Sequence, residues 1–90
     1  MRSLLWLSIA LIFFAIPSLA LENHKNGILA FEQGDYETAL IEFKTLAKQN
    51  DSLGQYGLGL MYDLGTGVSI NFKEAVKWYQ LSADQGNSDA

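Results

Sequence analysis

Apolar residues recur at intervals of three and four along most of the chain after residue 20, which is the spacing of one face of an α-helix. The segment 36–49 shows this pattern most clearly, because charged residues occupy much of its opposite side. Its apolar side consists of Tyr36, Ala39, Leu40, Phe43 and Ala47. The pattern predicts an all-α chain with helices over residues 21–33, 36–49, 53–64 and 72–85.

The expected ends of these helices carry residues that start or stop a helix. A polar side chain at the start accepts a hydrogen bond from a free backbone N–H, and glycine adopts the left-handed conformation that ends a helix. The first helix is expected to bury Ile28, Leu29 and Phe31. The expected caps and stops are Gly34, Asp35, Ser52 with Gln55, Asn71 with Glu74, and Gly86.

Three glycines, Gly54, Gly57 and Gly59, lie inside the helix predicted over residues 53–64. Each costs about 0.8–1 kcal/mol relative to alanine. We therefore expect another helix to pack so closely that a methyl group would clash; the alternative is a frayed helix. Residues 65–68 (Gly-Thr-Gly-Val) predict a turn that returns Val68 to the core. They lack the Gly-Lys-Ser/Thr ending and the preceding strand of a phosphate-binding loop.

The chain repeats itself at a shift of 36 residues, which takes Asp35 to Asn71. The cap, the apolar side and the terminator of the second predicted helix recur in register in the fourth. The further pairs are Tyr36 with Phe72, Ala39 with Ala75, Leu40 with Val76, Phe43 with Tyr79, Ala47 with Ala83, Gln49 with Gln85 and Asn50 with Gly86. Such a period is typical of helical-hairpin solenoids, in which each unit buries one face against the next.

Residues 1–20 differ in character from the rest. Arg2, an apolar run and Pro17 are followed by Ser18 and Ala20, small residues at the positions that a signal peptidase reads. We expect a signal peptide over residues 1–20, cleaved after Ala20, and an exported protein that is periplasmic or secreted. The alternative is an uncleaved N-terminal membrane anchor, although the apolar run falls short of the roughly 20 residues that span a bilayer.

Charge and composition restrict the chemistry. The net charge is −4, and it becomes −5 once residues 1–20, which carry Arg2 and no acid, are removed. An acidic chain without an arginine cluster argues against a nucleic-acid partner. With no cysteine and one histidine, His24, which we expect to be solvent-exposed, we predict no metal site and no cofactor. A serine triad would depend on His24 and lacks the motif around a nucleophilic serine. We predict that the protein is not an enzyme; the alternative is a small exported hydrolase.

A set of spaced residues between positions 54 and 86 carries a family resemblance: Leu58-Gly59, Met61-Tyr62, Gly65-Thr66-Gly67-Val68, Ala75, Trp78-Tyr79, Ala83 and Gln85-Gly86. This segment resembles a Sel-one-like repeat, a relative of the tetratricopeptide repeat. Residues 21–50 resemble a degenerate preceding unit. Gly54 and Ser82 stand where the family usually has alanine. The structural positions that the resemblance implies are Gly59, Tyr62, Gly65, Gly67, Ala75, Trp78, Tyr79, Ala83 and Gly86.

The resemblance implies an α-solenoid of antiparallel helix pairs over residues 21–90, with units at about 21–50 and 51–86. It further implies a non-catalytic scaffold or adaptor of the bacterial envelope or exterior that binds another protein or peptide. In solenoids the first helix of each pair usually lines the concave surface. The partner-binding candidates are therefore Gln55, Leu58, Tyr62 and Asp63. We expect self-association through the uncapped C-terminal face; the alternative is a truncated or decayed fragment of a longer repeat protein.

Overall fold

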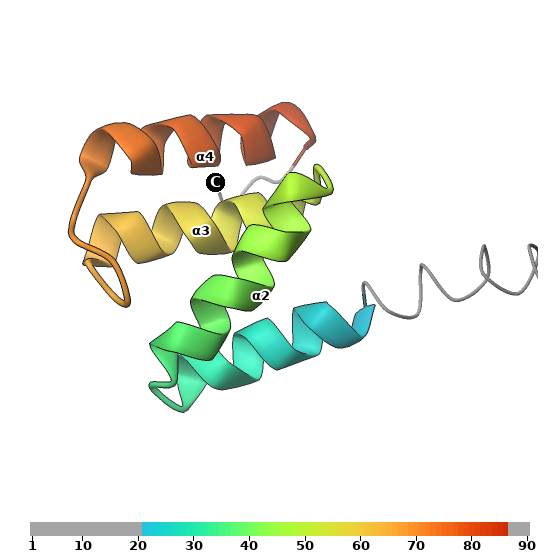
Figure 1. The fold of residues 1–90 in the computed structure, drawn as a ribbon. Helices are drawn as coiled ribbons and strands as arrows, with labels where there is room; N and C mark the ends of the chain where they lie inside the picture. Colours follow the sequence, from blue (N-terminus) through green and yellow to red (C-terminus); the bar gives the residue numbers. More distant parts are fainter. Residues whose placement is uncertain (1–20, 87–90) are drawn as a thin grey trace, which may run out of the picture.

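The computed structural model describes residues 21–86, which are helical over residues 21–32, α2 (Tyr36–Lys48), α3 (Ser52–Leu64) and α4 (Phe72–Asp84). Figure 1 shows α3 and α4 lying side by side and antiparallel, with α2 crossing from the helical segment 21–32 to α3. Central α3 packs against both α2 and α4. The predicted all-α hairpin architecture is thus confirmed. The predicted signal peptide over residues 1–20 lies outside the described residues.

The core forms where α2 meets α3 and the segment 21–32. In α2 the predicted apolar side is buried at its centre, with Tyr36 and Leu40 half-buried at its edge, and Leu46, which the periodicity omitted, is also fully buried. The expected burial in the first helix is wrong for Ile28 and Leu29, which are 41% and 53% exposed, whereas Phe31 is half-buried and packs against the core. The core residues are Ala30, Ala39, Phe43, Leu46, Ala47, Leu58 and Met61.

The α3 glycines lie where neighbouring helices approach most closely. A methyl group at Gly54 would meet the Leu46 side chain and lie 2.6 Å from the backbone nitrogen of Ala47. At Gly57 it would lie 2.8 Å from the ring of Phe43, again on α2. Gly59 faces the opposite neighbour, because its methyl group would come within 2.8 Å of the Tyr79 ring on α4. The expected close packing is confirmed, and α3 is continuous rather than frayed.

The start of α3 differs from the expected capping box at Ser52. Asp51 is the N-cap, and its Oδ1 accepts hydrogen bonds from the backbone N–H groups of Leu53 and Gly54, at 3.0 and 3.1 Å. Ser52 is the first helical residue, and its backbone carbonyl accepts a hydrogen bond from the hydroxyl of Ser82. A carboxylate is the stronger acceptor at the positive end of a helix, which explains why Asp51 displaces its neighbour.

Substituting Asp51 and Ser52 one at a time should show which of them caps α3. We expect Asp51→Ala to lower the free energy of unfolding by about 1–2 kcal/mol, because two N–H groups lose their acceptor. Ser52→Ala, the matched control, should change it by less than about 0.5 kcal/mol. Urea denaturation followed by circular dichroism measures both. A larger loss for Ser52→Ala would show that the cap has been assigned to the wrong residue.

The connection from α3 to α4 follows the predicted turn. Gly65 and Gly67 have φ angles of 69° and 73°, and Val68 returns to pack against the core. Asn71 caps α4 by accepting from the backbone N–H of Glu74. The Glu74 carboxylate instead accepts from the indole nitrogen of Trp78, so the capping box is only half formed. Gly86, with φ of 91°, follows the last helical turn as predicted.

The apolar side of α4 that repeats the side of α2 is largely uncovered. Ala75 and Ser82 are buried against α3, but Phe72 and Val76 are 64% and 60% exposed. Ala83 is exposed as well. The register shared with α2 predicts that Phe72 and Val76 are covered, and this prediction is wrong, because none of the described helices covers them.

Candidate protein-interaction surface

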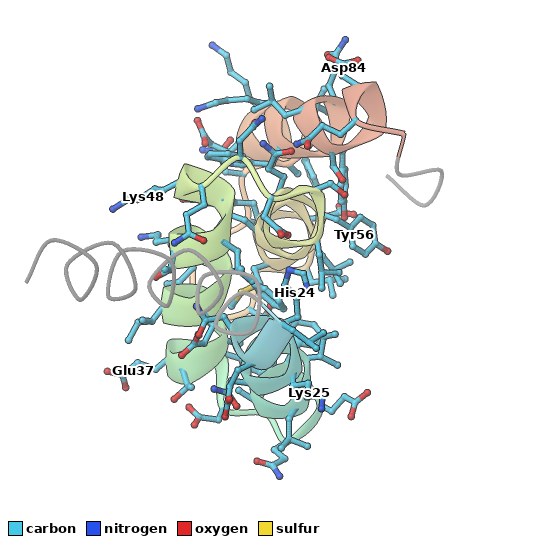
Figure 2. The ribbon with its side chains drawn as sticks, turned by 90° about the vertical axis from the view of Figure 1, so that its right-hand side faces the viewer. His24, Lys25, Glu37, Lys48, Tyr56 and Asp84 are labelled. Carbon is cyan, nitrogen blue, oxygen red and sulfur yellow. The ribbon has the colours of Figure 1, made fainter. Side chains whose placement is uncertain are left out.

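A groove of about 310 Å³ lies between the helical segment 21–32 and α3. Leu53, Tyr56 and Leu60 follow one another at helical spacing along one side of α3, and Tyr56 extends outward from that helix (Figure 2). Gly57 lies within this stretch, so the Phe43 ring from α2 contributes to the lining. The groove residues are Ile28, Phe31, Glu32, Phe43, Leu53, Tyr56, Gly57 and Leu60.

The groove is apolar with a charged residue in its lining. Glu32 supplies a carboxylate beside the rings and aliphatic chains of the other residues. A second, shallower apolar depression shares Ile28 and Glu32 with the groove. Leu29 and Lys25 complete its lining. Exposed apolar side chains of this kind, next to a fixed charge, are the usual composition of a protein-binding site.

The four residues expected to contact a partner lie elsewhere on α3. Gln55 and Leu58 are only 2% and 3% exposed, so their side chains are not presented on the surface. Gln55 donates to Asn50 at 3.0 Å and accepts from Gln85 at 2.7 Å, which ties the ends of α2 and α4 to α3. The burial of Gln55 and Leu58 disfavours a direct contact with a partner, although Leu58 lines a depression of about 220 Å³, and the assignment of these two residues stays a prediction.

The other two candidates, Tyr62 and Asp63, are half-buried at the junction of the helices. Tyr62 packs against the core and lines a depression of about 220 Å³ near Trp78. Asp63 accepts a hydrogen bond from the Tyr79 hydroxyl at 3.1 Å. A contact between either residue and a partner stays a prediction. The groove residues Leu53, Tyr56 and Leu60 were missed, although their spacing marks one helix side.

Tyr79 holds α4 on α3. Its ring lies over Gly59, and its centroid is 5.7 Å from that of Tyr56. Partial burial raises the pKa of Tyr79 to about 12, with further contributions from the hydrogen bond to Asp63 and from the nearby charges of Asp63 and Tyr56. The phenol therefore stays protonated and continues to donate to Asp63 well above neutral pH. Trp78 is half-buried against the core, as expected for a packing residue.

His24 connects the helical segment 21–32 to the start of α3. Its Nε2 lies 2.8 Å from Oδ2 of Asp51, and the two side chains are 26% and 24% exposed. The expectation of a solvent-exposed histidine is therefore wrong. Over residues 21–86 no three histidine or acidic side chains converge as metal ligands would, and none of the helices there has the length and apolarity to cross a membrane.

The antiparallel helix pairs, the glycine contacts between them and the shared register of α2 and α4 define the chain as a helical-hairpin repeat protein. Residues 52–87 match the family model of the Sel1 repeat. The resemblance seen at residues 54–86 is confirmed, and the degenerate unit over residues 21–50 stays a prediction. Residue 87 is the one matched position outside the described range.

Two known proteins are similar to part of this chain. A putative sel1-like repeat-containing protein of Acanthamoeba polyphaga mimivirus is 48% identical over 44 residues, which are 49% of this chain and 8% of that protein. The DAP3-binding cell death enhancer 1 of Rattus norvegicus is 43% identical over 56 residues, which are 62% of this chain and 11% of that protein. The chain thus spans about a tenth of the length of these relatives. No solved structure gives a significant match.

Proposed function

We propose that this protein is a non-catalytic scaffold that binds another protein through the groove between the helical segment 21–32 and α3. The Sel1 repeat supports this, because such repeats generally serve protein interaction, and one relative is named for binding a protein, DAP3. The observation that carries the proposal is the apolar groove itself, in which two helices and the Phe43 ring form one surface.

The lining of the groove indicates the chemistry of its ligand. Aliphatic and aromatic side chains fit an apolar segment of a partner protein, and Glu32 fits a lysine or arginine beside that segment. The acidic balance of residues 21–90 favours the same sign of charge on the partner. We therefore propose a partner segment that combines apolar residues with a basic one.

Site-specific photo-crosslinking tests this assignment. A benzophenone amino acid in place of Tyr56 should give a discrete adduct with a partner protein in producing cells. The same amino acid in place of Ile41, which is 59% exposed on α2 and outside the groove lining, is the matched control and should not. Adding Leu60→Lys to the Tyr56 variant should reduce the adduct at least about tenfold, because a buried, unpaired charge opposes binding. An equal adduct from both positions, or one insensitive to Leu60→Lys, would contradict the groove as the binding site.

We also propose that the protein is exported to the periplasm or the exterior. The support is the order of Arg2, the apolar run and the small residues before position 21. Mass spectrometry of the protein purified from producing cells tests this through its N-terminus. A mature chain that begins at Leu21 is expected, and a chain that retains residues 1–20 in the membrane fraction would favour the anchor instead.

A further inference from the structure

One side of α4 has the composition of a helix-docking face, but among the described residues only α3 touches it, at its edge through Tyr79. Phe72, Val76, Tyr79 and Ala83 share this side, because their spacing follows the 3.6-residue turn. We call these four residues the α4 stripe. The first two are more than half exposed, Ala83 is exposed, and Tyr79 is half-buried at the edge nearest α3.

The equivalent side of α2 shows what such a stripe does in this fold. Phe43, the counterpart of Tyr79, packs against Gly57 of α3. Ala47, the counterpart of Ala83, is buried near Gly54 of the same helix. The α4 stripe therefore has the form of a surface made to receive a helix.

We propose that a second copy of this chain covers the α4 stripe, with the two α4 helices antiparallel about a two-fold axis. The spacing of the stripe is self-complementary in this arrangement. When Phe72 faces Ala83 of the second copy, the same register places Val76 opposite Tyr79 of the second copy. The symmetry then repeats both contacts, as an isologous interface requires.

The sizes of the side chains favour the antiparallel direction. The large ring of Phe72 lies at one end of the stripe and the small Ala83 at the other. Antiparallel pairing places the ring over the methyl group at both ends of the contact, which allows even packing. Parallel pairing would place ring against ring at one end and leave a gap between two alanines at the other.

Charges beside the stripe select the same direction. Lys73 and Asp84 are both exposed, lie at opposite ends of α4, and occupy the same flank of the stripe. Asp84 extends outward at the end of α4 (Figure 2). Antiparallel pairing about a two-fold axis keeps this flank on the same side of the contact in both copies, so each lysine lies within a turn of an aspartate of the second copy. Parallel pairing places the two flanks on opposite sides of the contact, so these charges do not pair. Such exposed pairs add little affinity, but they discriminate between directions.

These observations favour a second copy over an unrelated protein, because both halves of the contact are present on α4 itself. Four residues from each helix bury less than a standard interface of about 1,600 Å², so we expect a weak, concentration-dependent dimer. The contact is separate from the groove beside the segment 21–32. Its failure would leave the proposed function standing, and the reverse also holds.

Disulfide trapping tests the register, because the chain contains no cysteine. Two differently tagged full chains, one with Phe72→Cys and one with Ala83→Cys, are co-produced and oxidised in the cell. We expect a mixed disulfide at least about fivefold more abundant than either homodisulfide. Two copies of position 72 would lie about 16 Å apart along the antiparallel pair, by the helical rise per residue, which exceeds the Cα distance of about 7 Å that a disulfide allows.

Charge reversal provides the second measurement. Lys73→Asp in both tagged chains should reduce the mixed disulfide about threefold or more, and Lys73→Asp combined with Asp84→Lys should restore it. Chains with cysteine in place of Glu37 and Ile41, both exposed on α2, give the background for random collision. A mixed disulfide no higher than this background would overturn the proposal, as would dominant Phe72→Cys homodisulfides or trapping of a different protein at position 72.

Analytical ultracentrifugation of the purified chain measures the monomer–dimer equilibrium directly. The unsubstituted protein should show dimer at high concentration and lose it on dilution. Val76→Glu should be monomeric at every concentration while its circular dichroism is unchanged, because the side chain it replaces is exposed in the monomer. An unsubstituted protein that stays monomeric at millimolar concentration, or a Val76→Glu variant that still dimerises, would contradict the α4 contact.

Discussion

We expect Phe43→Ala to remove most of the free energy of unfolding of the protein at 25 °C. The Phe43 side chain is 4% exposed and contacts three parts of the fold at once, because its ring meets both Gly27 in the segment 21–32 and Gly57 in α3 from its place on α2. Removing a buried phenyl ring costs about 4 kcal/mol. A core of this size rarely supplies more than about 3–5 kcal/mol, so little stability would be left.

The measurement is urea denaturation followed by circular dichroism, with an osmolyte added to keep the variant folded at the start. Ile41→Ala on the same helix is the matched control, because that side chain is 59% exposed. It should change the free energy of unfolding by less than about 0.5 kcal/mol. Phe43→Leu, which keeps part of the volume, should fall between the two. A cost below about 1 kcal/mol for Phe43→Ala would show that the ring does not join the three elements.

The sequence placed Phe43 on the apolar side of α2, because local signals determine much of α2 and α4. Asp35 and Asn71 both cap as predicted, and both helices end within one residue of the expected position. These features depend on hydrogen bonds between residues that are close in sequence. Periodicity and capping therefore predicted the fold class, the helix order and most of the helix ends.

Periodicity and capping could not predict which residues of α3 face the neighbouring helices and which line the groove. Apolar residues occur almost all round this helix, so periodicity does not say which of them face neighbours. The glycines decide it, because Gly54 and Gly57 let α2 approach on one side and Gly59 lets α4 approach on another. Gln55 and Leu58 are consequently buried, whereas Leu53 and Tyr56 line the groove.

The sequence also could not predict which regular apolar patterns stay exposed in the folded protein. Ile28 and Phe72 both belong to regular apolar patterns, and the pattern alone predicts burial. Burial also needs a neighbouring element, and no described helix covers either residue. The interaction surfaces proposed for this protein lie at these two places, where the pattern of a core side lacks a covering helix.

We expect Gly54→Ala to destabilise the protein by about 2 kcal/mol, although alanine is the better helix former by about 1 kcal/mol. The added methyl group would meet the Leu46 side chain, and it would lie 2.6 Å from the backbone nitrogen of Ala47 and 2.8 Å from the backbone carbonyl carbon of Leu46. Backbone atoms cannot rotate away, so α2 and α3 would have to separate, and overpacking of this kind costs more than the propensity returns.

Gly57→Ala is the matched control, because the three atoms nearest to its methyl group would all belong to the ring of Phe43, at 2.8 Å. In a Phe43→Leu background the cost of Gly57→Ala should shrink by about 1 kcal/mol, since the smaller side chain removes the clash. In a Leu46→Ala background the cost of Gly54→Ala should not shrink, because the Cβ of residue 46 and the α2 backbone stay in place. Urea denaturation of both cycles measures the difference. Stabilisation by Gly54→Ala would mean that the two helices do not touch at this glycine, because the gain in helix propensity would then face no opposing contact.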